Sequence, residues 1–192
     1  MDNVVISALE NTHIRNDPPA TPSALTSSLL LSDIKGSAVM FPTLSTLFSS
    51  AAVKDVAKSL LYLGGAINGP IHLTSVTDST LVVACRQLRM HDAKNVDVYL
   101  LCSSRPIIED CSGIRFAPLG GGIGGEWENV KNLWDQVDDF KWLKSEHSPN
   151  WAVLPEEQRI PRQKWEEVRD KRVVDGVVGE DLASLVRGFR SL

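Results

Sequence analysis

One apolar pattern recurs through the middle of this 192-residue chain and limits the folds open to it. An apolar residue is followed by a second one three positions later and by a third one five positions after that. Turn-forming residues such as Gly36-Ser37 and Asp78-Ser79 stand between the second and third members. The pattern occurs five times, at intervals of 17 to 22 residues: Leu31/Ile34/Val39, Val53/Val56/Leu61, Leu73/Val76/Leu81, Met90/Ala93/Val98 and Ile108/Cys111/Phe116.

A repeat of this length favours stacked coils of short strands. Helical repeat proteins need roughly 33 residues or more per unit and a helical periodicity, which these segments lack. Within Leu81–Cys85 the residues on both alternating faces are apolar, as in a strand that is covered on both sides. Each coil would bury its apolar face only against its neighbours. We therefore predict a mainly-β chain that folds as a parallel β-helix.

The composition changes along the chain and divides it into three parts. Residues 1–22 are rich in proline and polar residues near their end, and we interpret them as a tail or linker. Residues 23–118 form the β-helix, and residues 119–192 form a glycine-rich connector and a C-terminal extension that packs on it. All five tryptophans lie in this last part. Apolar residues at helical spacing predict helices over 126–139 and near 180–190, so the cap is expected to be helical and tryptophan-rich.

Charge and cysteine content exclude several classes of protein. The chain has 20 basic and 24 acidic side chains, a net charge of −4 that argues against a dedicated nucleic-acid binder. No apolar run approaches the roughly 18–20 residues of a membrane span, and the N-terminus lacks a signal-peptide core. Cys85, Cys102 and Cys111 fit no zinc spacing. We expect small buried thiols in a cytosolic protein.

Four segments carry a family resemblance. They begin with the run from Leu81 to His91, which contains Arg86-Gln87-Leu88-Arg89, and continue with Ser104–Pro118, Val137–Leu143 and Ser148–Trp151. Together they resemble the C-terminal domain of tubulin-binding cofactor C over roughly residues 25–155. That family folds as a right-handed parallel β-helix. The last two segments favour cofactor C over the related retinitis pigmentosa protein, which acts on an Arf-like GTPase and ends in a different kind of domain.

The resemblance implies an activator of a GTPase and not an enzyme in its own right. With cofactors D and E, cofactor C stimulates GTP hydrolysis by β-tubulin and releases the native tubulin heterodimer, so a cytoplasmic, cytoskeleton-associated location is expected. The family's catalytic arginine closes a Gln-Gln-Leu-Arg run, which places it at Arg89 and the second glutamine at Gln87. Arg86 replaces the first glutamine, a partner-contacting position in the family.

The chemistry of such an arginine can be stated without the family. GTP hydrolysis develops negative charge on the phosphoryl group, and an arginine supplied by a second protein can accelerate it about 10³–10⁵-fold. The planar guanidinium donates two hydrogen bonds to phosphate oxygens and stays charged. Because strand residues alternate, Leu88 and Met90 facing inward would direct Gln87 and Arg89 outward.

Other polar residues offer weaker candidates. His91 is expected on the surface near Arg89. His91-Asp92 could form a general base with its orienting carboxylate, but no serine or cysteine nucleophile that would use such a base is identifiable. Arg105 and Glu109 fit either the same partner-facing surface or a structural ion pair. The glycine cluster 120–125 lacks the βαβ context of a dinucleotide site. We expect the carboxylates of Asp138 and Asp139 to be solvated. The sequence therefore predicts no metal site and no cofactor site.

Two alternative functions remain open from the sequence. The arginine mechanism would serve an Arf-like GTPase as well as β-tubulin. A non-catalytic module like the actin-binding β-helix of cyclase-associated proteins would not need Arg89. A polysaccharide lyase is excluded because its calcium-binding carboxylate groove is missing from these coils.

Overall fold

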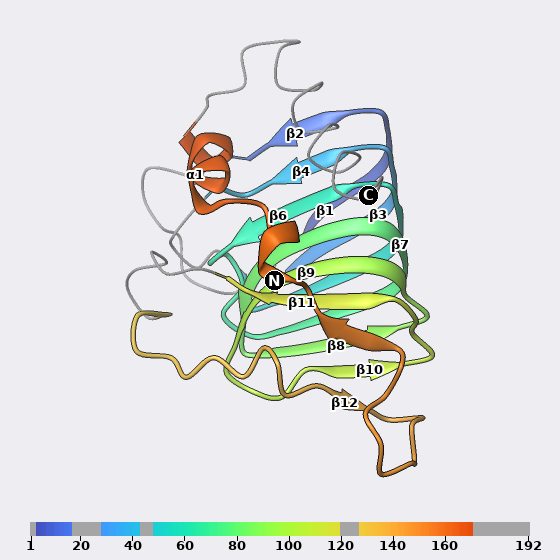
Figure 1. The fold of residues 1–192 in the computed structure, drawn as a ribbon. Helices are drawn as coiled ribbons and strands as arrows, with labels where there is room; N and C mark the ends of the chain where they lie inside the picture. Colours follow the sequence, from blue (N-terminus) through green and yellow to red (C-terminus); the bar gives the residue numbers. More distant parts are fainter. Residues whose placement is uncertain (1–2, 17–27, 43–47, 120–126, 171–192) are drawn as a thin grey trace.

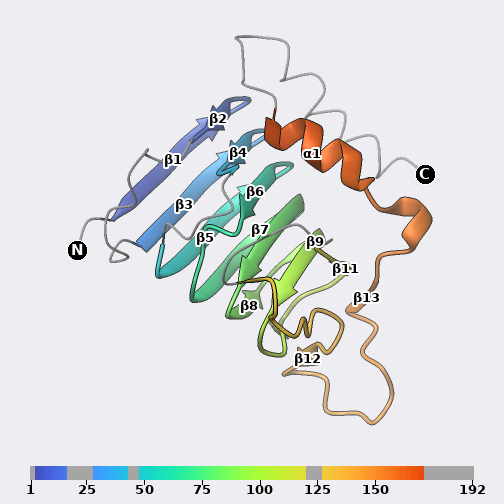
Figure 2. The ribbon, with the colours of Figure 1, turned by 90° about the vertical axis from the view of Figure 1, so that its left-hand side faces the viewer.

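The computed structural model describes residues 3–16, 28–42, 48–119 and 127–170. The strands in these ranges stack in two rows, and within each row neighbouring strands run parallel (Figures 1 and 2). Strand β7 (Pro70–Cys85) is long and contributes to both rows. The first row otherwise contains β1 (Val4–Glu10), β3 (Ser28–Lys35), β5 (Ser50–Ala57), β8 (Gln87–His91), β10 (Ile107–Glu109) and β12 (Asp138–Asp139). The second row contains β2 (His13–Arg15), β4 (Ala38–Met40), β6 (Leu60–Gly64), β9 (Lys94–Cys102), β11 (Ile114–Pro118) and β13 (Trp151–Val153).

The predicted stack of coils is confirmed, and the apolar pattern is its core. The first members of the five sets are register neighbours from Leu31 to Ile108. The third members form a second column from Val39 to Phe116. All fifteen residues are buried. Each coil thus buries its apolar side chains against the next one, as the β-solenoid architecture requires.

The solenoid begins earlier than the expected boundary at residue 23. Strands β1 and β2 lie within residues 1–22 and pair in parallel with β3 and β4. Ile6, Leu9 and Ile14 stand opposite Leu31, Ile34 and Val39 and repeat the same spacing. The proline-rich stretch that suggested a linker follows this coil in the sequence, and residues 17–27 lie outside the described part of the chain.

A ladder of serines holds the corner between the two rows. The backbone N–H of Ser37 donates to the hydroxyl of Ser59, and the N–H of Ser59 donates to the hydroxyl of Ser79, both at 3.1 Å. Each hydroxyl in turn donates to the carbonyl two residues before it. Because these serines are buried, the ladder satisfies backbone groups that the sharp corner would otherwise leave unpaired.

The helix expected over 126–139 is wrong for the described residues, because 127–137 run as an irregular segment along the solenoid. The amide of Asn132 accepts from the N–H of Cys102 and donates to the carbonyl of Leu100. The N–H of Leu133 donates to the Cys102 carbonyl at 2.9 Å. The segment is therefore held to the end of β9, and its own backbone bonds, from Val130 to Trp127 and from Gln136 to Leu133, close single turns and no α-helix.

Four of the five tryptophans pack on the solenoid. Trp127 is buried, and Trp134 and Trp151 lie against the main core. Trp165 belongs to α1 (Arg162–Asp170) and contacts the rings of Tyr62 and Tyr99 on the outer face of the second row. A short 3-10 turn (Glu156–Gln158) precedes this helix. The helix expected near 180–190 lies outside the described residues, and none of the described helices has the length and apolar character to cross a bilayer.

Candidate functional site

Arg89 stands at the middle of β8 with its side chain exposed, as the strand alternation predicts. Its neighbours Leu88 and Met90 are at most 1 % exposed and anchor the strand in the core. The backbone on both sides of Arg89 is therefore fixed while its guanidinium remains in solvent. A side chain presented in this way is better positioned than one on a mobile loop.

Arg89 belongs to an outward column of three register partners, His72 on β7, Arg89 on β8 and Ile107 on β10. We call this set the Arg89 column. Among the described residues, Arg89 has no side-chain hydrogen bond or ion pair. A positive charge held in solvent by a rigid strand is available to an anionic group on another molecule.

Arg86 differs from Arg89 although the two are three positions apart. Its Nε donates to the Asn68 side chain at 2.7 Å, and its guanidinium lies over the ring of the buried Trp127 at 4.4 Å from the centroid. Arg86 is half-buried at the corner where β7 ends, and so is Gln87 at the start of β8. The guanidinium of Arg86 thus makes contacts within the molecule.

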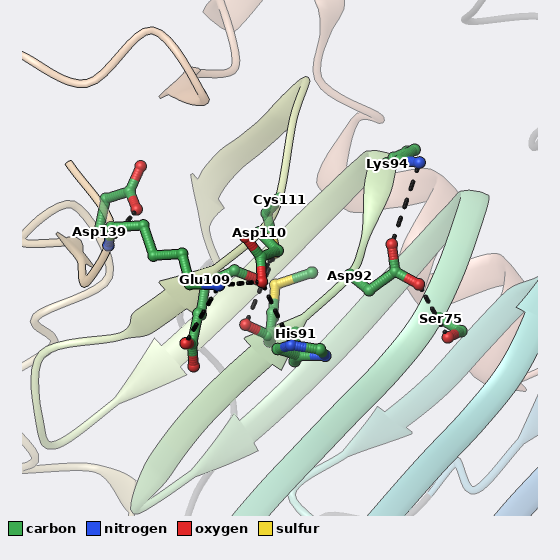
Figure 3. A network of polar contacts seen from close by, with 10 residues as sticks. Ser75, His91, Asp92, Lys94, Glu109, Asp110, Cys111 and Asp139 are labelled. Carbon is green, nitrogen blue, oxygen red and sulfur yellow. Dashed lines mark hydrogen bonds and ion pairs between the residues drawn. The ribbon is translucent and has the colours of Figure 1, made fainter.

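A polar network begins at His91, two residues after Arg89 on β8, and is drawn in Figure 3. The Nε2 of His91 is 3.5 Å from a carboxylate oxygen of Asp110, which also accepts a hydrogen bond at 2.5 Å from Lys141. The ammonium of Lys141 is 3.7 Å from Glu109. The hydrogen bond from Lys141 lowers the pKa of Asp110, and the same bond raises the pKa of Lys141. Asp110 and Lys141 thereby connect His91 on β8 with Glu109 on β10.

The other sequence candidates form structural contacts. Arg105 makes a two-pronged ion pair with Asp138, and the hydrogen bond to that carboxylate raises the pKa of Arg105 further. Glu109 pairs with Lys141, so both candidates have an ion pair within the chain while their side chains remain partly exposed. Asp92 accepts from the hydroxyl of Ser75 and does not orient His91. Within the described ranges, no group of three His, Cys, Asp or Glu side chains is placed to hold a metal ion.

Sequence reasoning missed three residues on this face. His72 precedes Arg89 by one coil interval of 17 residues, so the repeat register could have placed it. Lys141 and Phe140 come from the turn after β12, 30 or more residues away from β10, and no local signal links them to it. Phe140 is 54 % exposed, and its backbone N–H donates to the carbonyl of Ile108. An exposed aromatic side chain therefore borders the network.

The stacked parallel coils define the chain as a β-solenoid protein, and within its described residues Arg89 stands on a rigid strand without a side-chain hydrogen bond or ion pair. The family model "Tubulin binding cofactor C" matches residues 26–140, more than half of the chain, so the chain belongs to the tubulin binding cofactor C family. It is 45 % identical over 112 residues to tubulin-specific chaperone C of Mus musculus, covering 54 % of this chain and 33 % of that protein. It is also 45 % identical over 111 residues to tubulin-folding cofactor C of Arabidopsis thaliana, covering 54 % and 32 %.

More distant relatives agree with the family. Protein XRP2 of Danio rerio is 29 % identical over 129 residues, which cover 59 % of this chain and 33 % of that protein. The solved structure of tubulin binding cofactor C from Leishmania major superposes with a TM-score of 0.52 at 30 % identity, covering 57 % of this chain and 81 % of that one. The match spans about a third of the length of the curated relatives.

Proposed function

We propose that this domain stimulates GTP hydrolysis by β-tubulin, acting with cofactors D and E in release of the tubulin heterodimer, and that Arg89 supplies the catalytic guanidinium. The observation that carries the proposal is the state of Arg89, exposed and anchored between two buried neighbours. Two relatives that are 45 % identical over the matched region, tubulin-specific chaperone C and tubulin-folding cofactor C, are named for tubulin folding. A cytoplasmic, cytoskeleton-associated location goes with this proposal.

The proposed mechanism assigns Arg89 to the transition state. As the β–γ phosphate bond of GTP breaks, negative charge grows on the oxygens of the transferring phosphoryl group. The guanidinium donates two parallel N–H bonds to these oxygens from a strand that does not need to move. No covalent bond to this chain forms, and the nucleotide and the attacking water belong to the GTPase. The domain is therefore an activator in this proposal.

The surface around Arg89 fits a protein partner. His72 and Ile107 flank Arg89 on neighbouring strands, about 4.8 Å away on each side. The half-buried Gln87 and the exposed His91 lie on the same strand, Glu109 lies on β10, and the exposed Phe140 lies in the turn after β12. A mixture of charged groups and an exposed aromatic ring is typical of contact surfaces. We propose that Gln87, His91, Arg105 and Glu109 contact the partner, and that Arg86 supports them from the corner.

The proposal is tested by measuring GTP hydrolysis on tubulin with cofactors D and E. The chain should accelerate hydrolysis, Arg89→Ala should remove the acceleration, and Arg162→Ala, an exposed arginine on α1, should keep it. An Arf-like GTPase in parallel reactions should show no comparable acceleration. Acceleration of the Arf-like GTPase alone would overturn the assignment to tubulin. If neither GTPase is accelerated, the activator role is wrong and the domain is a non-catalytic binding module.

A further inference from the structure

Two buried cysteines occupy the same position on consecutive coils. Cys85 ends β7 and Cys102 ends β9, and they are register partners in the second row. Both side chains are 0 % exposed, and their sulfur atoms are 3.9 Å apart, with the thiol of Cys85 donating to Cys102. All three cysteines are free and buried, which confirms the expected small buried thiols.

The chain between Cys85 and Cys102 is one complete coil, and it carries Arg89. It contains the corner at Arg86, the strand β8 and most of β9. The hydroxyl of Ser103, directly after Cys102, donates to the carbonyl of Arg86 at 3.1 Å, and the backbone N–H of Ser103 donates to the carbonyl of Cys85. The sulfur pair therefore lies at the corner that leads into the strand presenting the exposed arginine.

The two thiols have different reactivity. Hydrogen bonds from Cys85 and from Ser104 outweigh burial and lower the pKa of Cys102 to about 7. Burial raises the pKa of Cys85 well above its usual value. A thiolate is the nucleophile in thiol chemistry, so Cys102 is the attacking residue and Cys85 the resolving one. Cys111 is different, because its thiol donates to the carbonyls of Met90 and Glu109 and burial raises its pKa.

We propose that Cys85 and Cys102 are a peroxide-sensitive pair that closes a reversible disulfide around the coil carrying Arg89. The geometry permits the bond, because in-register residues on neighbouring strands are about 4.8 Å apart, within the roughly 4.4–6.8 Å range of Cα distances in disulfides. Closing the bond requires the sulfurs to move from 3.9 Å to about 2.05 Å and the two Cβ atoms to approach to about 3.5–4.5 Å. This inference rests on the cysteine geometry and does not depend on the proposed GTPase function.

The reaction balances with hydrogen peroxide as the oxidant. The Cys102 thiolate attacks one peroxide oxygen, so that an S–O bond forms, the O–O bond breaks and hydroxide leaves. The Cys85 thiol then attacks the sulfenic sulfur of Cys102, forming the S–S bond and releasing the oxygen as water with the thiol proton. The two sulfurs lose two electrons, and peroxide gains them. A dithiol reductant returns the electrons and reopens the bond.

The disulfide would join two points 17 residues apart and restrict the unfolded chain. A loop of that size predicts a rise in melting temperature of about 6–12 °C for a chain of this length. We therefore expect a more heat-stable coil around Arg89 under peroxide.

The test is a thiol map of the full chain before and after treatment with hydrogen peroxide, with the alkylation done under denaturing conditions because all three thiols are buried. Oxidation should remove two alkylatable thiols, yield one peptide pair that joins Cys85 to Cys102, and leave Cys111 free, with all effects reversed by dithiothreitol. Cys111→Ser should retain the cross-link, and Cys102→Ser should lose it. Because the wild-type peptide map alone decides the pairing, a variant that fails to fold does not affect the result.

Three results would overturn the proposal: both thiols remain alkylatable, Cys102 becomes a sulfinic acid without a cross-link, or Cys111 or a second chain is joined instead. None of these readouts involves a GTPase. A failed hydrolysis assay together with a mapped Cys85–Cys102 disulfide would reject the proposed function and keep the redox pair.

Discussion

The guanidinium of Arg86 lies over the indole of Trp127, 4.4 Å from the ring centroid, while Arg89 three residues later points into solvent. The two arginines of one short run thus have different environments. Trp127 is only 1 % exposed, so the contact is shielded from water on the indole side. We infer that Arg86 stabilises the fold and that Arg89 is free to act on a partner.

Arg86→Gln should therefore reduce stability more than activity. The change removes a cation–π contact worth about 0.5–2 kcal/mol and alters the bond to Asn68. We expect the free energy of unfolding in urea to fall by about 1–3 kcal/mol, with stimulated GTP hydrolysis retained. Unchanged stability together with lost stimulation would instead place Arg86 in the partner contact.

The ion pair between Arg115 and Asp97 should contribute more to stability than the pair between Arg105 and Asp138. Asp97 is 6 % exposed and accepts two hydrogen bonds from Arg115, at 2.7 and 2.8 Å. Asp97→Asn should lower the free energy of unfolding by about 3–5 kcal/mol, because Arg115 would keep a partly buried, unpaired charge. Asp138→Asn on the exposed pair is the matched control and should cost at most about 1 kcal/mol. Equal losses for the two variants would contradict this ranking.

Ser59→Ala tests the serine ladder. The variant removes the acceptor of the buried Ser37 N–H and should destabilise the chain by about 1–3 kcal/mol. Ser112→Ala, at an exposed corner position of a later coil, should change stability by less than about 0.5 kcal/mol. Thermal denaturation of both variants measures the difference. A Ser59→Ala variant as stable as Ser112→Ala would show that water replaces the hydroxyl without cost.

Asp139 should make stability depend on pH in the acid range. Burial raises the pKa of Asp139, but hydrogen bonds from Ser148 and Asn150 outweigh it and lower the pKa below its usual value. A carboxylate with a depressed pKa in the folded state stabilises it above the unfolded pKa of about 3.9 and loses this contribution as the pH falls through the folded value. Unfolding measured from about pH 5 to pH 2 should show a smaller loss for Asp139→Asn than for the wild type. The exposed Asp33→Asn is the control, and identical curves for Asp139→Asn and the wild type would contradict this role.

The repeat predicts most of the fold because each apolar set has a fixed place in the coil. Leu73, Val76 and Leu81 occupy the same three places as the corresponding residues of the next coil, so spacing alone gives the register. The first coil was missed because its set, Ile6, Leu9 and Ile14, is followed in the sequence by a proline-rich stretch. The false helix has another cause: its apolar residues at helical spacing belong to a segment whose backbone bonds to β9.

The candidate site was predictable only where strand alternation determines it. Because the side chains of Leu88 and Met90 face the core, the side chain of Arg89 between them must face outward. In the structure Leu88 and Met90 are buried and Arg89 is exposed. The partners of Arg105 and Glu109 could not be predicted, since Asp138 and Lys141 lie about 30 residues further along the chain. The contact of Arg86 with Trp127 spans 41 positions and likewise depends on how the C-terminal segment crosses the solenoid.

The most direct test of the central claim is the rate of GTP hydrolysis on tubulin, with cofactors D and E, for the wild type, Arg89→Ala and Arg89→Lys. Arg89→Ala should unfold within about 0.5 kcal/mol of the wild type, because its side chain is exposed. It should still bind tubulin, but its stimulation should fall by about 10³-fold or more, since the guanidinium acts on transition-state charge. Lysine should not restore the rate, because a point charge lacks the two-pronged donor geometry. Full stimulation by a folded Arg89→Ala variant would contradict the account.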